Sequence, residues 1–202
     1  PASITEKSNC GAGITMATNG KPSRKVVTDA LVTLKAYKRR GTTGRDPDTG
    51  DGCGIEFHGI HHAVQSWFPK CNLTEGHYAI GSVFIKDSEE SIAQSTAIIS
   101  SVAQRFDWEF QMERKVPIDN RYEGIMAKED SRQSYQFILT SNKETSIQQK
   151  DIELRKIRLV LEYSPEISAK GLGMHVSSLS TNSVIYKTRV LESHFAPPLQ
   201  YQ

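Results

Sequence analysis

One stretch limits the possible folds of this chain more than any other. Residues 41–54, GTTGRDPDTGDGCG, contain five glycines and three aspartates within fourteen positions. Glycine adopts positive φ angles at little cost, and aspartate favours turns because its side chain bonds to nearby backbone. The composition therefore predicts a loop of several consecutive turns. Regular elements must end before this loop and begin again after it.

Regular structure is predicted on both sides of the loop. Before it, residues 10–18 read as a strand, and Ser23 is the expected cap of a helix over 24–38. Strands alternate with helices along the rest of the chain, which is typical of a layered α+β fold. Apolar spacing places strands at 54–59, 77–85, 108–112, 135–139, 174–179 and 184–187, and helices around 63–68, at 88–106 and at 147–163.

Two features of this scheme concern packing and pairing. The charged helix at 147–163 is expected to turn Ile152, Leu159 and Val160 towards the core. The last two strands are expected to form a hairpin around residues 180–182. Residues 113–134 show little periodicity and read as a linker.

Composition excludes several classes of protein. The 202 residues include 25 basic and 23 acidic side chains, so the net charge of +2 indicates neither nucleic-acid binding nor attraction to an anionic membrane. No apolar run approaches the roughly 18–20 residues that span a bilayer. Three widely spaced cysteines give no disulfide framework and favour a reducing compartment. We expect a cytoplasmic protein, or an organelle protein after removal of a transit peptide.

The residue spacing in this sequence does not match known metal-binding or phosphate-binding motifs. Asp46, Asp48 and Asp51 suggest a calcium loop, but Gly50 stands where the fifth position needs an oxygen ligand, and Phe57 replaces the glutamate at the twelfth. Residues 13–22 lack the spacing of a phosphate loop, and Pro22 replaces its Ser or Thr. Four histidines, His58, His61, His62 and His77, have no cysteine or carboxylate at zinc-ligand spacing. The sequence therefore predicts no metal site.

The residues that can carry chemistry are a thiol and a cation. Cys10 begins the segment CGAG, whose glycines allow another group to approach closely. Arg40 directly precedes Gly41 and the glycine-rich loop, and an arginine can hold a carboxylate through two parallel hydrogen bonds. These residues alone leave two interpretations open, because a lone cysteine is more often packed than catalytic. The loop can equally be an ordinary surface turn.

A family resemblance narrows these alternatives. CGAGI, then GKPS and a helix, then RRGTTGRDPDTGDGCGI, resemble the opening of the glutaminase domain of the glutamate synthase large subunit. EGHYAIGSVFI, RKVPID and MHVSSLSTNSVIYKTRVL resemble its later segments, in the same order. The resemblance covers nearly the whole chain, from Cys10 to about Leu191. An unrelated small-ligand domain does not explain a match of this extent.

The resemblance implies a class II glutamine amidotransferase with an N-terminal-nucleophile fold, an αββα sandwich that is incomplete here relative to the family. Cys10 matches the nucleophile that hydrolyses glutamine to glutamate and ammonia, and Arg40, Gly11 and Gly41 match its supporting site. The expected partners are glutamine and the remaining synthase domains or subunits. No cofactor is expected in this chain, since the flavin and the iron–sulfur centre belong elsewhere in a full synthase. Ammonia assimilation there ends on 2-oxoglutarate.

Several departures from the family affect activity. The family's cysteine is the first residue of the mature chain, whereas residues 1–9 precede Cys10 as a leader or propeptide-like arm. An amide nitrogen cannot act as the base that a free α-amino group provides. Arg39 replaces the usual His, and Cys53 the usual Ala. The family's Asn-Gly oxyanion hole lies beyond the matched hairpin.

These departures leave two functions open. We expect a glutaminase-like domain over 10–191, a tail over 192–202, and no measurable ammonia release from the chain as given. One reading is the nucleophile part of a glutaminase that other segments complete. The other is a catalytically inactive glutaminase-like module with a binding or regulatory role.

Overall fold

The computed structural model describes residues 11–21, 23–37, 46–50, 52–129, 132–168, 173–191 and 194–195. They fall into two compact units. The larger unit is drawn from Glu56–Ile118, Ser131–Tyr186 and Pro198–Gln202, and the smaller from Pro1–Ile55, Asp119–Asp130 and Lys187–Pro197. Each unit is described by itself below.

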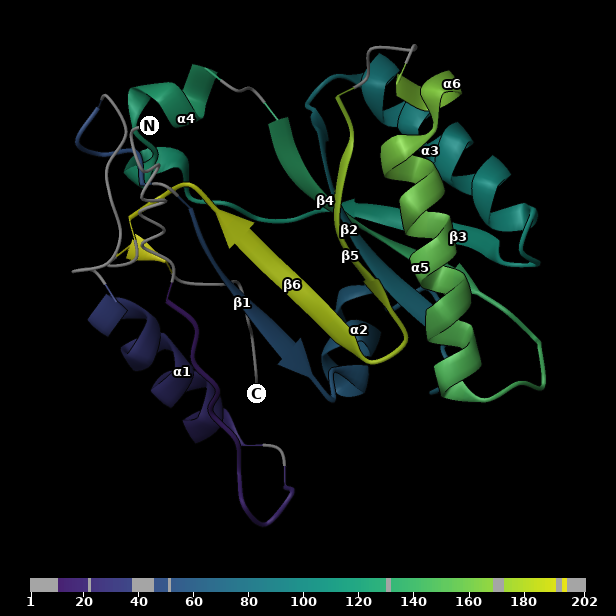
Figure 1. Ribbon diagram of the computed structural model, residues 1–202, viewed down its shortest axis with the longest axis horizontal. Coiled ribbons are helices and arrows are strands. Elements are labelled where there is room, and N and C mark those ends of the chain that lie inside the picture. Colours follow the sequence, from purple (N-terminus) through teal and green to yellow (C-terminus); the bar gives the residue numbers. More distant parts are fainter. Residues whose placement is uncertain are drawn as a thin grey trace, which may run out of the picture. The chain divides into compact units, whose positions relative to one another are not determined.

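The larger unit is built on a four-stranded antiparallel sheet (Figure 1). Its strands stand in the order β3-β4-β2-β5. Every second residue of the two central strands, such as Val83 and Phe137, faces one side and is almost completely buried. The residues between them, such as Ile80 and Ile138, are buried as well, so both faces of the central strands are covered. The strands are β2 (Tyr78–Lys86), β3 (Glu109–Lys115), β4 (Arg132–Thr140) and β5 (His175–Ser180).

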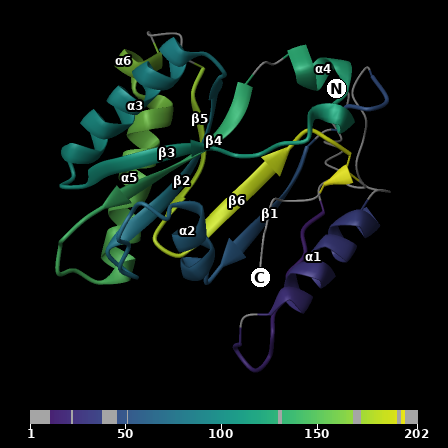
Figure 2. The same cartoon turned by 180° about the vertical axis from the view of Figure 1, so that it is seen from behind.

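Two helices, α3 (Glu89–Gln104) and α5 (Ile147–Tyr163), cover that face of the sheet (Figures 1 and 2). Each begins at a serine whose side chain accepts a hydrogen bond from the backbone three residues on. Ser88 accepts from Ser91 N and Ser146 from Gln149 N, both at 3.2 Å. Such caps satisfy backbone donors that the first helical turn leaves unpaired. The predicted helices at 88–106 and 147–163 are therefore confirmed, apart from a shorter end to α3.

The prediction of which residues of α5 point towards the core is wrong. Ile152 and Leu159 are each 50% exposed, and only Val160 of the predicted three packs against the core. The buried positions are Lys150, Leu154, Ile157 and Leu161, which recur at helical spacing. The helix carries two apolar stripes, and periodicity alone does not show which of them meets the sheet. The aliphatic stem of Lys150 joins the buried stripe while its Nζ donates to Gly76 O at 2.9 Å.

The opposite face of the sheet meets α2 (His61–Trp67) and aromatic side chains from a second strand pair, β1 (Cys53–His58) and β6 (Ser183–Thr188). The Tyr186 ring stands edge-on to the rings of Phe57 and Trp67, at centroid distances of 6.1 and 6.2 Å. Arg114 of β3 lies over Trp67, with its guanidinium carbon 4.7 Å from the ring centroid. This contact joins the four-stranded sheet to the aromatic layer.

The predicted C-terminal hairpin is also wrong, although both of its strands exist. β5 belongs to the four-stranded sheet, whereas β6 pairs with β1. The chain turns between them because Asp151 Oδ1 accepts hydrogen bonds from Thr181 N and Thr181 Oγ1, at 3.1 and 3.0 Å. The next residue, Asn182, accepts from Gly59 N, just past the end of β1. These long-range contacts redirect the strand, and a sequence pattern does not display them.

The smaller unit contains α1 (Arg24–Ala36), the 3-10 turn η2 (Asn120–Tyr122) and α4 (Ile125–Glu129). The predicted strand at 10–18 is not found over residues 11–17, because these residues form no ladder with another described strand. Helix α1 has Ser23 at its N-cap position, as predicted, although the side chain makes no capping bond. No residue of α1 is buried.

The predicted linker at 113–134 is wrong in part, since β3 extends to Lys115, α4 occupies Ile125–Glu129 and β4 starts at Arg132. The expected α+β class is confirmed. Helices and antiparallel sheets of this kind are consistent with the N-terminal-nucleophile sandwich that the resemblance implies. Among the described helices, including the short α6 (Pro165–Ser168), none has the length and apolarity to cross a membrane.

Candidate active site

Of the four predicted site residues, Cys10, Arg40 and Gly41 lie outside the described residues. Gly11 is described and is exposed. The roles that the resemblance implies for Cys10, Arg40 and Gly41 stay predictions. The site is therefore built from the described residues that adjoin these positions in the chain.

The segment that follows Cys10 lies against the end of α1 (Figure 1). Tyr37, the residue after α1, donates a hydrogen bond from its hydroxyl to Ala12 O at 2.7 Å. A Cβ on Gly11 would stand 2.7 Å from Tyr37 Cδ1, and a Cβ on Gly13 would stand 3.1 Å from the Tyr37 hydroxyl. The ring occupies the space that side chains at 11 and 13 would need. A side chain at position 11 would therefore displace the ring, whereas one at position 13 would require only a small shift of it.

The described end of the glycine-rich loop is held by Asp46. Its Oδ2 accepts hydrogen bonds from Met126 N at 3.1 Å and from the Thr49 hydroxyl, and its Oδ1 accepts from Asp48 N at 2.9 Å. The Thr49 bond, followed by the Met126 bond, lowers the pKa of the Asp46 carboxyl from its ordinary value. The loop is consequently fixed to the start of α4 by an ionised carboxylate.

Gly124 permits this arrangement. A Cβ at position 124 would stand 2.6 Å from both Thr49 N and Asp46 Oδ2, closer than real Cβ contacts come. Thr49 itself is only 1% exposed. The loop continues to Gly50, whose N–H donates to Arg189 O at 2.8 Å, and to Cys53, whose thiol lies 3.7 Å from Val190 O. Among the described aspartates of this loop, Asp46 therefore organises the backbone.

Two of the four histidines considered as zinc ligands have other side-chain partners. His61 Nδ1 lies 3.1 Å from the hydroxyl of Tyr78, whose pKa burial raises to about 12 with a smaller effect from Glu75. His58 Nε2 lies 3.5 Å from Glu56 Oε1 at an exposed position. Within the described ranges, no three His, Cys, Asp or Glu side chains are placed to hold a metal ion.

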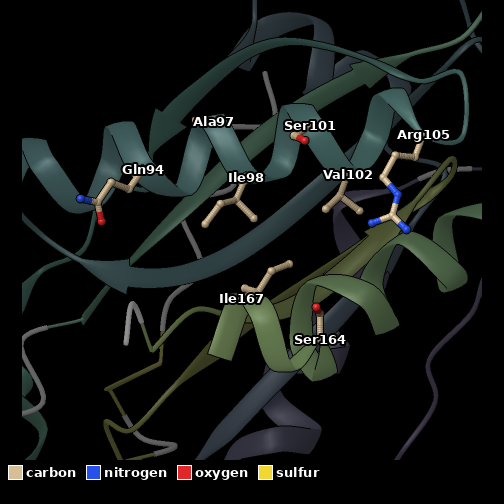
Figure 3. A pocket seen from close by; sticks show the side chains of 8 residues that line it. All are labelled: Gln94, Ala97, Ile98, Ser101, Val102, Arg105, Ser164 and Ile167. Atoms are coloured by element: carbon tan, nitrogen blue, oxygen red, sulfur yellow. The ribbon is translucent and has the colours of Figure 1, made fainter. Parts of the chain in front are cut away.

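A hollow of about 660 Å³ lies in the larger unit (Figure 3). Ile98, Val102 and Ile167 face into it, and Arg105 stands at one end. Among the described residues, its lining includes no cysteine, histidine or carboxylate, and Gly11 does not line it.

Sequence reasoning missed Tyr37, Thr49 and Gly124. Tyr37 continues the helical spacing of apolar residues in the predicted helix over 24–38, and its place three residues before Arg40 is the one signal that links it to the motif. Gly124 lies in a segment without periodicity, and no local signal marks its contact with Thr49. Only the folded chain brings residues 46–49 beside 124–126.

A comparison with models of known protein families identifies the family of this chain. A family model described as "Glutamine amidotransferases class-II" matches residues 10–197. The chain belongs to the class II glutamine amidotransferases. The match begins at Cys10, the residue that the resemblance places at the nucleophile position. It ends two residues beyond Phe195 and so takes in every described element.

Relatives of this amidotransferase domain are glutamate synthases. The glutamate synthase [NADPH] large chain of Azospirillum brasilense is 31% identical over 90% of this chain and 12% of its own length. Ferredoxin-dependent glutamate synthase 1, chloroplastic/mitochondrial, of Arabidopsis thaliana is 26% identical over 91% of the chain and 12% of its own length. Glutamate synthase [NADH] of Schizosaccharomyces pombe is 27% identical over 90% of the chain and 9% of its own length. The chain therefore spans about an eighth or less of these curated relatives.

Proposed function

We propose that this amidotransferase domain carries the nucleophile of a glutaminase reaction, and that Cys10 is that nucleophile. The family match, which begins at Cys10, is the observation that carries the proposal. Arg40, Gly11 and Gly41 are the proposed supporting residues. The domain extends over 10–191 in this proposal, with residues 1–9 as a removable arm and 192–202 as a tail.

The proposed reaction passes through a thioester. The Cys10 thiolate attacks the side-chain carbonyl carbon of glutamine, and the C–N bond breaks as the nitrogen takes a proton and leaves as ammonia. Water then attacks the thioester carbon, releasing glutamate and returning the thiol. Once Cys10 is the first residue, its α-amino group, with an ordinary pKa of about 8, can accept the thiol proton.

Two further elements of the proposal concern what lies around the domain. The relatives are about eight times longer or more, so we propose that other segments of a synthase-like protein complete the site and use the ammonia. Flavin and iron–sulfur chemistry belongs to those segments and not to this chain. The compartment is proposed to be the cytoplasm or an organelle.

The alternative is a glutaminase-like module that binds or regulates without catalysis. What favours it is that nine residues precede Cys10, so that its nitrogen is part of a peptide bond in the sequence as given. A thiol without its neighbouring base is a poor nucleophile at neutral pH. The two proposals differ in whether the Asn9–Cys10 bond is cleaved.

Mass spectrometry and an ammonia assay on the protein from its natural source separate the proposals. We expect a mature chain that begins at Cys10 and releases ammonia from glutamine, with activity abolished by Cys10→Ala and kept by Cys71→Ala. The 202-residue chain by itself is expected to release none. An intact Asn9–Cys10 bond in an inactive natural protein would favour the binding module.

A further inference from the structure

The geometry points to Tyr37 as a positioning residue for Cys10, acting through the backbone of Gly11–Gly13. The inference rests on the proposed role of Cys10 and deepens it. It assigns a function to a side chain that neither the motif nor the family match singles out. Every contact that supports it lies within the smaller unit.

The contacts combine one hydrogen bond with close packing. The Tyr37 hydroxyl donates to Ala12 O, two residues after Cys10, at 2.7 Å. The ring edge lies where a Cβ on Gly11 would stand, 2.7 to 3.1 Å from Cδ1, Cε1 and Cγ. Thr33, one helical turn before Tyr37, brings its methyl group to 3.2 Å from the corresponding point on Gly13. Together they form a seat for three consecutive residues.

This seat matters because, among the described residues, no strand pairing adds to it at positions 11–13. Residues 11–13 are exposed and belong to no strand, and the turn at Ala17–Gly20 lies further along the chain. A peptide without ladder bonds or burial samples many backbone conformations. The Ala12 carbonyl is therefore the point at which the described structure restrains the residues that follow the nucleophile.

Tyr37 itself is held firmly enough to provide this restraint. Its backbone keeps helical angles, φ −75° and ψ −2°, and its N–H bonds to Leu34 O and Lys35 O at the C-cap of α1. Thr33, beside it, donates its hydroxyl to Asp29 O at 2.8 Å, which fixes the rotamer that presents the methyl group. A nucleophile held in a productive orientation reacts faster than one that samples many.

Two measurements on Tyr37→Phe test the inference. The substitution removes the hydroxyl and keeps the ring, and Tyr163→Phe, at the 72% exposed end of α5, is the matched control. We expect backbone NMR order parameters of residues 11–13 to fall in the 202-residue Tyr37→Phe chain and to stay unchanged in the control. In the natural protein, kcat should fall about two- to tenfold with an unchanged KM, as expected for one hydrogen bond.

The possible results of these measurements distinguish the contact itself, its effect on Cys10 and the proposed function. Unchanged order parameters in Tyr37→Phe would overturn the claim that the hydroxyl restrains the segment. Lower order parameters with wild-type kcat would show that the restraint is structural and does not position Cys10. A natural wild-type protein without glutaminase activity would instead overturn the proposed function, and the order parameters would still report on the contact. Gly11→Ala should reproduce the kcat loss, because the added methyl displaces the same ring.

Discussion

Gly124 shows how one missing side chain can hold a loop in place. Its Cα faces Thr49 and Asp46, with no room for a methyl group. We predict that Gly124→Ala lowers the free energy of unfolding by about 1–3 kcal/mol, because the loop backbone must move away. Hydrogen exchange at the Met126 amide should quicken as its bond to Asp46 lengthens. Gly20→Ala is the control: its added Cβ meets nothing within 4 Å, and although its φ of +68° makes the substitution strained, it should not quicken exchange at that amide.

The hydrogen bonds that the Asp46 carboxylate accepts from Thr49 and Met126 should make the stability of the chain depend on pH. Its pKa is lower in the folded chain than in the unfolded one, so its contribution to stability is present above the unfolded value of about 4. That contribution is lost as the pH falls through the lower, folded pKa. Asp46→Asn should therefore flatten the acid side of the stability curve, measured by urea denaturation between pH 2 and 7. Asp48→Asn, in the same loop but exposed, is the control; equal acid limbs in wild type and Asp46→Asn would contradict the prediction.

Helix α5 carries leucine on each of its two apolar stripes. Substituting one leucine of each stripe in turn tests which stripe faces the core. Leu154 is completely buried and Leu159 is 50% exposed. We predict that Leu154→Ala costs about 2–5 kcal/mol of stability, since it leaves a cavity against the sheet. Leu159→Ala should cost about 1 kcal/mol or less. Chemical denaturation of both variants checks this, and equal losses would mean that α5 is rotated from the described position.

The same helix shows what could and could not be predicted from the sequence. The limits of α5 were predictable because its serine cap and its length are local signals. Its orientation, and the pairing of β6 with β1, depend on contacts between residues far apart in the chain, such as Asp151 with Thr181. The site divides in the same way: Cys10 and Gly11 follow from the motif and the resemblance, whereas the seat on Tyr37 needs the folded backbone.

At the scale of the whole molecule, the two units differ in how much of their structure is buried. The core cluster lies entirely in the larger unit and unites the sheet with α3 and α5. Helix α1 of the smaller unit buries none of its residues, and its Val32 is 63% exposed. The described residues that adjoin the proposed nucleophile therefore belong to the part with less burial. Local opening free energies follow such differences in burial.

Native-state hydrogen exchange should reveal this difference directly. We predict that the amides of α1 exchange through local opening, and that those of β2 and β4 exchange near the limit set by global unfolding. Because α1 lacks buried side chains, its hydrogen bonds are protected mainly by the helix itself, and short helices are marginally stable alone. Helix α5 is the internal control, since it shares the exposure of a surface helix but buries Leu154, Ile157 and Leu161. Adding mild denaturant should leave the exchange of α1 nearly unchanged and accelerate that of β2. Equal protection of α1 and α5 would contradict this prediction, because it would require the smaller unit to unfold together with the core.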